Sequence, residues 1–350
     1  MSNHISFYLR LRQLSAYVLR AAAKYLKINK TIYVQDRIPE YRKYWQEASD
    51  ALSLEFVRLT DELWEINNET RKIRIATHKI PINDPVVLYI CADKLVCYNF
   101  AVSQNIPVPQ HRVFRLQTLA EAKNFIKGSG AYVVKPARGT GSGQGVTTQI
   151  QTSKQLERAA ILASTYCQDF IVEKMVLAES IKLFYLDGQF IHASRRRGVR
   201  VIGDGQSTIK QLMLSQGHGQ VSLDLNAVLT LEAQGLSFES IPSADREILV
   251  RSFPGNETSS HELRTVYDET ITDLVGPELA IECACLVREV GCDIASVDVI
   301  TEDPGESLKK SGGVFIEINA DPGIHHHYNN ENDHKESVAK AILKYLFEIK

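Results

Sequence analysis

The sequence predicts an α/β (α+β) protein, because helical and extended segments alternate along most of its length. The chain has 350 residues, enough for two or three structural units that each bury a core. Apolar residues make up 44% of it and charged residues 23%, as in globular proteins, which excludes general disorder. The sequence contains no internal repeat.

Charge and hydropathy exclude several other classes of protein. The 40 Lys and Arg residues oppose 42 Asp and Glu residues, so we expect no nucleic-acid partner and no membrane partner. No window of about 18 residues is apolar and uncharged, as a membrane span requires. Basic residues interrupt the N-terminal apolar stretch, which argues against a secretory signal. The six cysteines contain no CxxC pair, which favours reduced thiols and a cytoplasmic location.

Residues 1–92 are expected to form a small N-terminal α/β domain. Apolar residues at three- and four-residue spacings, with basic residues between them, predict an amphipathic helix over residues 5–27. Such a helix can lie on a membrane surface, but packing on its own domain or on a second subunit is the more usual role. Strands are predicted at 32–34, 55–59 and 71–78 around a helix at 40–52. Pro81 and Pro85 then mark a boundary.

The pattern sharpens after Asp93. Helices are predicted at 94–104, 118–127, 154–163, 277–290 and 336–347, and strands at 132–135, 169–172, 295–300 and 314–318. An Asp-Gly turn joins strands at 181–186 and 189–193 in a hairpin. Ser207 is placed to cap a helix that ends at Met213.

A glycine-rich stretch follows the predicted strand that ends in Lys135. Glycines at 139, 141, 143 and 145 can fold backbone N–H groups into a nest that binds an anion. The stretch matches neither GxGxxG nor a Walker A loop. A flexible linker would have the same composition. The lysine immediately before the loop favours a phosphate site.

Acidic and amide side chains share two predicted C-terminal strands. Strand alternation predicts Phe315, Glu317 and Asn319 on one face, opposite Ile316 and Ile318. Asp298 lies in the middle of another strand, and facing side chains of neighbouring strands come within about 5 Å of each other. Three oxygen donors suit a hard cation such as magnesium. An ordinary solvated face is the alternative, although acids are depleted in strands.

Two further runs attract a functional interpretation that we do not favour. His325, His326 and His327 are consecutive, so they cannot all face one ion, and no other zinc-type spacing accompanies them. The basic stretch from Arg195 to Arg200 is short and lacks interleaved aromatic residues, so contact with an anionic substrate or a phosphate, or simple solvation, is a better interpretation than nucleic acid.

Taken in this order, the segments resemble the ATP-grasp superfamily of carboxylate–amine ligases, above all the ATP-grasp domains of cyanophycin synthetase and of bifunctional glutathione synthetase. The resemblance covers about residues 93–347. Its most discriminating string runs from Glu317 to Gly323, Glu-x-Asn-Ala-x-Pro-Gly. It implies the ATP-grasp fold, in which two α+β subdomains (here 93–176 and 177–350) grip ATP after the N-terminal domain.

The resemblance also implies site residues. Lys94 and Lys135 would reach nucleotide phosphates. The loop residues Gly141, Ser142, Gly143, Gln144, Gly145 and Val146 would close over ATP. The hinge residues Glu173, Lys174 and Val176 would hold adenine, with Glu179 as the displaced acid that follows the hinge. Asp298, Glu317 and Asn319 would bind Mg²⁺, with Mn²⁺ as the alternative.

Arg251, Arg196 and Lys135 are the catalytic residues that the resemblance implies, and Asn256 roughly matches an asparagine of the family. The chain departs from the family pattern at Ser180, Lys182, Gly198 and Ser259-Ser260. These departures fall on the acceptor side of the site, where substrate identity is decided.

The implied activity is that of an ATP- and magnesium-dependent ligase. It would join a carboxylate to an amine through an acyl phosphate, on amino acids or short peptides, and the resemblance also implies a homodimer. Two alternatives stay open: a phosphotransferase whose phosphorylated product is final, and a nucleotide-binding regulatory protein without turnover.

Overall fold

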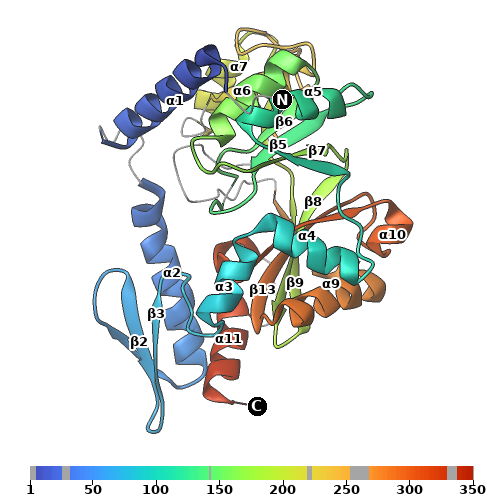
Figure 1. The fold of residues 1–350 in the computed structure, drawn as a ribbon. Coiled ribbons are helices and arrows are strands. Elements are labelled where there is room, and N and C mark those ends of the chain that lie inside the picture. The colour runs from blue at the N-terminus through green and yellow to red at the C-terminus, as the bar shows by residue number, and fades with distance from the viewer. Residues whose placement is uncertain are drawn as a thin grey trace. The chain divides into compact units, whose positions relative to one another are not determined.

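The computed structural model describes residues 5–25, 32–141, 143–218, 223–252, 268–328 and 337–349. The chain forms two compact units that alternate along the sequence (Figure 1). Unit 1 contains residues 1–30, 109–177 and 197–268, and unit 2 contains residues 31–108, 178–196 and 269–350. The sequence-based boundaries at residues 92 and 176 stay a prediction. No described helix is long and apolar enough to cross a bilayer.

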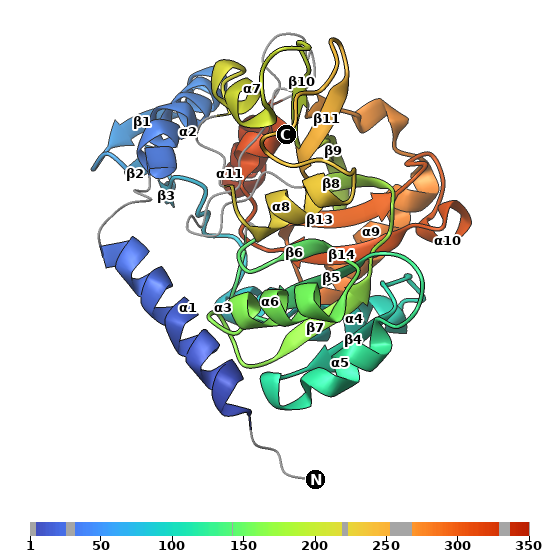
Figure 2. The same cartoon turned by 90° about the horizontal axis from the view of Figure 1, so that it is seen from above.

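Unit 1 is built on a four-stranded antiparallel sheet of order β4-β7-β5-β6 (Figure 2). A separate pair, β10-β11, is also antiparallel. The elements of this unit are α1 (Phe7–Tyr25), β4 (His111–Phe114), η1 (Leu116–Thr118), α5 (Leu119–Phe125), β5 (Tyr132–Pro136), β6 (Thr147–Ile150), α6 (Ser153–Ala163), β7 (Phe170–Lys174), β10 (Val199–Ile202), α7 (Ile209–Ser215), α8 (Leu225–Glu232) and β11 (Glu247–Arg251).

Alternation along these strands separates a core face from a polar one. Tyr132 and Val134 of β5 pack with α5 and α6 in one apolar core. Val133 and Lys135 therefore point to the opposite face of the sheet. The side chain of Lys135 therefore points away from this apolar core.

The start of α7 differs from the sequence-based prediction. Thr208, not Ser207, is the N-cap, since its side chain accepts the N–H of Gln211. Ser207 instead donates to Asp204 at 2.6 Å, so its hydroxyl belongs to the preceding turn. The adjacent threonine is left to satisfy the helix terminus.

Unit 2 contains a five-stranded antiparallel sheet of order β12-β9-β8-β13-β14 and a three-stranded one of order β1-β2-β3. Its elements are α2 (Ile32–Ala51), β1 (Glu55–Arg58), β2 (Leu63–Asn67), β3 (Lys72–Ala76), α3 (Pro85–Cys91), α4 (Lys94–Ser103), β8 (Glu179–Leu186), β9 (Gln189–Arg196), β12 (Glu269–Thr270), η2 (Thr272–Leu274), α9 (Pro277–Val290), β13 (Ile294–Thr301), α10 (Leu308–Ser311), β14 (Val314–Asn319), η3 (Ile324–His327) and α11 (Val338–Phe347).

The two faces of the five-stranded sheet have different chemistry. One face carries Leu183, Val297 and Val299 into an apolar core shared with α4 and α9. The opposite face is apolar only near Phe184 and Ile294, which pack with α2 and α11. The rest of that face carries polar side chains from β8, β9, β13 and β14.

The N-terminal part of unit 2 corrects one prediction and adds a strand. Residues 32–34 begin helix α2, although their β-branched and aromatic side chains favour a strand. The packing of the whole helix outweighs this local preference. Its buried residues recur at three- and four-residue spacing, as Ile38, Tyr41, Trp45 and Ala48. Strand β2 lies between the two strands that the sequence predicted.

Candidate functional site

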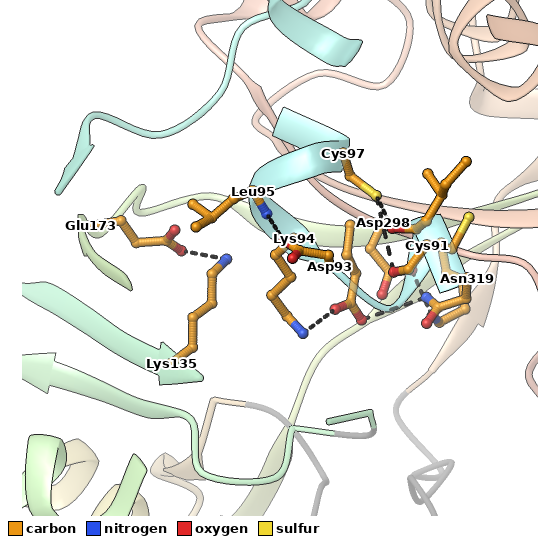
Figure 3. A network of polar contacts seen from close by, with 12 residues as sticks. Cys91, Asp93, Lys94, Leu95, Cys97, Lys135, Glu173, Asp298 and Asn319 are labelled. Carbon is orange, nitrogen blue, oxygen red and sulfur yellow. Dashed lines mark hydrogen bonds and ion pairs between the residues drawn. The ribbon is translucent and has the colours of Figure 1, made fainter. Parts of the chain in front are cut away.

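In unit 1, the predicted phosphate lysine and the predicted hinge glutamate form an ion pair. Residue 133 of β5 lies opposite Glu173 of β7, which places Lys135 one pleat away on the same face. Lys135 Nζ lies 3.0 Å from Glu173 Oε1 (Figure 3), and both side chains are buried. The carboxylate offsets the cost of burying the ammonium group and fixes its position.

Glycines occupy the positions with positive φ in the glycine-rich loop between β5 and β6. Gly139, Gly143 and Gly145 have φ values of 70°, 74° and 70°, the left-handed region that favours glycine. A Cβ on Gly145 would lie 2.8 Å from both Pro136 Cγ and Tyr166 Cδ2. Gly141 differs, since a Cβ there would meet nothing within 4 Å. Ser142 lies outside the described residues.

Short backbone hydrogen bonds close the tip of this loop. The N–H of Gln144 donates to Gly141 O at 3.1 Å, and that of Val146 to Gly143 O at 3.2 Å. Consecutive turns of this kind fold N–H groups into a concave surface. The described part of the loop therefore forms two consecutive turns, and its role in binding phosphate stays a prediction.

The hinge follows directly from the end of β7. The N–H of Lys174 donates to Gln110 O, and that of Met175 to Ala131 O, both at 2.9 Å. Val176 is half-buried. Beside the hinge lies a cavity of about 760 Å³ lined by Ala131, Leu177 and eight further residues, none of them charged. None of the predicted nucleotide-binding residues lines this cavity.

Arg251 is fully buried at the end of β11 and pairs with Asp224. The same carboxylate caps α8 by accepting the N–H of Ala227 at 3.0 Å. Sequence reasoning missed Asp224, because only the fold brings it to Arg251. The role of Arg251 in catalysis stays a proposal. Asn256 and Ser259-Ser260 lie outside the described residues.

In unit 2, the three predicted metal ligands lie on one face of the sheet. Asp298 of β13 is directly opposite Glu317 of β14, and Ser296 is opposite Asn319. Asn319 Nδ2 lies 3.5 Å from Glu317 Oε1. Residues from two distant segments therefore meet as the strand pattern predicted.

The predicted face of Phe315 is wrong. A β-bulge inserts Ile316 into β14, so that Phe315 pairs with Val299 while Glu317 pairs with Asp298. Phe315 therefore lies in the apolar core with Val299. The extra residue separates the aromatic ring from the carboxylate, which strict alternation cannot do.

Two lysines contact the acidic pair. Lys182 lies directly opposite Asp298 on β8, and its Nζ donates to Asp298 Oδ1 at 2.6 Å. Lys94 Nζ lies 3.6 Å from Glu317 Oε2. Lys94 is the first residue of α4, whose N-cap Asp93 accepts the N–H of Leu95 at 3.0 Å.

The donor set fits a hard divalent cation. Two carboxylates and one amide oxygen match the ligands of magnesium, which usually keeps several waters and binds substrate phosphates. Within the described ranges, no three or more His, Cys, Asp or Glu side chains group so as to hold a metal ion. The predicted set contains only two such residues, Asp298 and Glu317, with Asn319 as the third donor.

Of the residues at which the chain departs from the family pattern, Ser180 and Lys182 lie on β8 in the same sheet of unit 2, whereas Gly198 belongs to unit 1. Arg196 ends β9 opposite Ser180 and is buried. Glu179, which stands one residue before the position where the family has an acid, lies 2.7 Å from the Nε atom of Arg195 and forms an ion pair with it. Arg196 and Lys182, together with burial, hold the pKa of His326 well below its usual range.

The histidine run has contacts that the sequence did not show. His325, His326 and His327 form η3 and are all buried. His325 Nδ1 is 2.7 Å from the hydroxyl of Tyr41, and His327 Nδ1 is 3.0 Å from His192 Nδ1. The run therefore anchors the loop after β14 to α2 and β9.

Comparison with known proteins gives relatives of one kind, although no family model matches the chain. Cyanophycin synthetase of Trichormus variabilis is 28% identical over 271 residues, which are 74% of this chain and 29% of that protein. The glutathione biosynthesis bifunctional protein of Clostridium perfringens is 25% identical over 284 residues, 75% of this chain and 35% of that protein. The chain thus spans about a third of the length of these relatives.

A solved structure supports the fold. The bifunctional glutathione synthetase from Pasteurella multocida superposes with a TM-score of 0.53 at 19% identity, over 86% of this chain and 44% of that one. The chain therefore has the ATP-grasp fold. The fold class predicted from the sequence and the resemblance to ATP-grasp ligases are confirmed.

Proposed function

We propose that this chain is an ATP- and magnesium-dependent ligase that joins a carboxylate to an amine and releases ADP and phosphate. The observation that carries the proposal is the acidic pair Asp298–Glu317 on adjacent strands, with Asn319 beside it and Lys94 in contact. Carboxylates next to a lysine suit a metal-bound polyphosphate. The named relatives, a cyanophycin synthetase and a glutathione biosynthesis protein, support the same chemistry.

The reaction needs no protein nucleophile. A substrate carboxylate oxygen attacks the γ-phosphorus of ATP, and the bond from that phosphorus to the β,γ-bridging oxygen breaks to release ADP. The amine then attacks the acyl carbon, loses a proton and displaces phosphate. Positioning and charge neutralisation supply the acceleration.

Each group of residues has one task in this scheme. Asp298, Glu317 and Asn319 hold Mg²⁺, which when bound neutralises phosphate charge; Mn²⁺ has the same ligand preference. Lys94 and Lys135 neutralise the remaining charge, and Glu173 fixes Lys135.

The remaining predicted residues bind or shield the reactants. The loop from Gly141 to Val146 closes over the phosphates and excludes water from the reactive intermediate. Lys174 and Val176, with Glu179 following, bind the adenosine end. Arg251 and Arg196 stabilise negative charge on the acyl phosphate and the tetrahedral intermediate.

We propose amino acids or short peptides as the substrates. We also propose that the enzyme is a homodimer and that it is located in the cytoplasm. All six cysteines are free thiols, as in proteins of reducing compartments. The basic stretch from Arg195 to Arg200 favours a substrate that carries an extra carboxylate.

An ADP-release screen tests the proposal. The purified full chain is incubated with ATP, magnesium and amino acids, singly and in pairs, and coupled products are detected by mass spectrometry. We expect ADP together with an amide product for at least one pair. ADP with a phosphorylated product and no amide would assign a phosphotransferase. Nucleotide binding without any ADP release would assign a regulatory protein.

A further inference from the structure

Helix α1 exposes an unusually apolar surface. Its outward side chains include Phe7, Tyr8, Leu11, Leu14, Tyr17, Val18 and Leu19, which are between 43% and 77% exposed. Scattered exposed apolar residues are normal, but a contiguous set on one helix marks an interaction surface. The set contains none of the residues assigned above to the reaction.

The opposite side of α1 is fixed to unit 1, so the exposed side is not an accident of a loose helix. Helix α1 contacts α6 (Figure 1), and Ile5 and Leu9 pack against the core of that unit. Arg12 pairs with Glu157 at 3.0 Å, and the hydroxyl of Tyr17 donates to Ser164 O at 2.6 Å. The guanidinium of Arg20 lies 3.6 Å from the ring centre of Tyr166.

Helical geometry makes the exposed set one continuous face. Phe7, Leu11, Leu14 and Val18 follow each other at spacings of four, three and four residues, which places them in a single stripe. Tyr17 borders the stripe on one side, and Tyr8 and Leu19 lie beyond its other side. The wide apolar face of this amphipathic helix is therefore turned outward, and the opposite side, which combines Leu9 with Arg12 and Arg20, holds it to the protein.

The charge of the N-terminal part of the sequence points to what covers this face. Residues 1–35 contain six Lys and Arg residues and no acid. The whole chain carries −2, so residues 36–350 carry a net charge of −8. Arg10 is exposed on α1 beside the apolar stripe. A second copy of α1 would bring like charge against like charge, whereas an anionic lipid surface is complementary.

We propose that α1 is a peripheral membrane anchor that inserts Phe7, Leu11, Leu14 and Val18 among the lipids of an anionic bilayer surface. Tyr8 and Tyr17 would sit at the headgroup level, where amphipathic rings are favoured. Arg10 would contact anionic headgroups. The sequence alone favoured packing on its own domain or on a second subunit, and the outward direction and charge of the apolar face reverse this preference.

Vesicle flotation tests the anchor. The full-length protein is mixed with vesicles of phosphatidylcholine alone, or of phosphatidylcholine and phosphatidylglycerol, and floated through a density gradient. We expect binding to the anionic vesicles, weakened by added salt, and little binding to the neutral ones. The double variant Leu11→Ser/Leu14→Ser should bind the anionic vesicles on the order of tenfold more weakly. Arg10→Glu should weaken binding about fivefold or more.

A matched control uses an exposed leucine elsewhere in the same unit. Leu214 on α7 is 66% exposed, so Leu214→Ser removes similar apolar surface without touching α1. It should float like the wild type. Thermal unfolding should be the same for all variants, because every substituted side chain is exposed.

Several results would overturn the anchor. One is absence of binding to both kinds of vesicle. Another is undiminished binding of the Leu11→Ser/Leu14→Ser variant. If sedimentation shows a dimer that this double variant converts to a monomer, and neither form floats, a second copy of the chain covers the face instead.

Discussion

Lys182 and Asp298 lie directly opposite each other on β8 and β13, and Lys182 Nζ donates to Asp298 Oδ1 at 2.6 Å. Asp298 is also a predicted magnesium ligand. The carboxylate proposed to bind the metal is therefore already compensated by a cation. The lysine places a compact charge opposite this carboxylate.

Replacing this lysine should make stability depend on magnesium. In Lys182→Met, the mostly buried carboxylate loses its cation, which should cost about 1–3 kcal/mol of unfolding free energy. Added MgCl₂ should recover part of that loss, so the magnesium-induced rise in Tm should exceed that of the wild type. Lys310→Met is the control, since its ion pair with Glu278 is exposed. If added magnesium does not change the Tm of Lys182→Met, this would argue against a metal at Asp298.

Removing the charge of Glu317 should weaken the binding of the metal directly. We expect Glu317→Gln to raise the magnesium concentration for half-maximal ADP release by roughly 10–100-fold, because a neutral amide is a poorer ligand than a carboxylate. Glu302→Gln, an exposed acid just after β13, should leave the titration unchanged. An unaltered titration in Glu317→Gln would discard this residue as a ligand.

Variants of the buried pair Lys135–Glu173 can distinguish a structural role of Lys135 from a catalytic one. Lys135→Met alone leaves Glu173 buried without its cation, which should destabilise unit 1 by about 3–5 kcal/mol and abolish ADP release. The double variant Lys135→Met/Glu173→Gln removes both charges and should regain most of the stability but no turnover. Recovered turnover in the double variant would show that Lys135 serves the fold alone. Thermal unfolding and an ADP assay distinguish the outcomes.

Two glycines of the same loop should respond differently to alanine. Gly145 combines a φ of 70° with contacts at 2.8 Å to Pro136 and Tyr166, so Gly145→Ala should cost about 1–3 kcal/mol and lower ADP release strongly. Gly141 has open space around its Cβ position, so Gly141→Ala should keep the stability of the wild type. Equal unfolding curves for the two variants would contradict this account of the loop.

Arg251 is proposed to act on the reacting groups from a buried position. Arg251→Ala should lower kcat more than it weakens ATP binding, because the charge is needed when the acyl phosphate forms. Asp224→Asn keeps a side-chain oxygen at the cap of α8 while removing the charge that holds the guanidinium. If kcat is unchanged and only nucleotide affinity falls, the proposed role of Arg251 is wrong.

Local signals were sufficient where the ends of an element are encoded in the sequence. Helix α9 spans the predicted residues 277–290, because Pro277 opens its first turn and Gly291 ends it with a φ of 83°. The acidic strands were also predicted, since alternation and two carboxylates suffice to place Asp298 and Glu317 together.

The missed features depend on contacts between distant segments. The bulge at Ile316 has no sequence marker, and neither does the register that sets Lys182 against Asp298. Tyr41 reaches His325 across 284 positions of the chain. Residues 32–34 became helical because the buried side of α2 outweighed their local preference. In each case tertiary packing decided.

The additional residue in β14 makes the curvature of this sheet separable from its chemistry. Deleting one residue from a strand normally moves every following side chain to the other side. Here, loss of Ile316 would leave Phe315 against Val299 and Glu317 against Asp298, and would remove only the bend. A shortened, straightened strand could therefore report how much of the protein's activity comes from shape, with every chemical group retained.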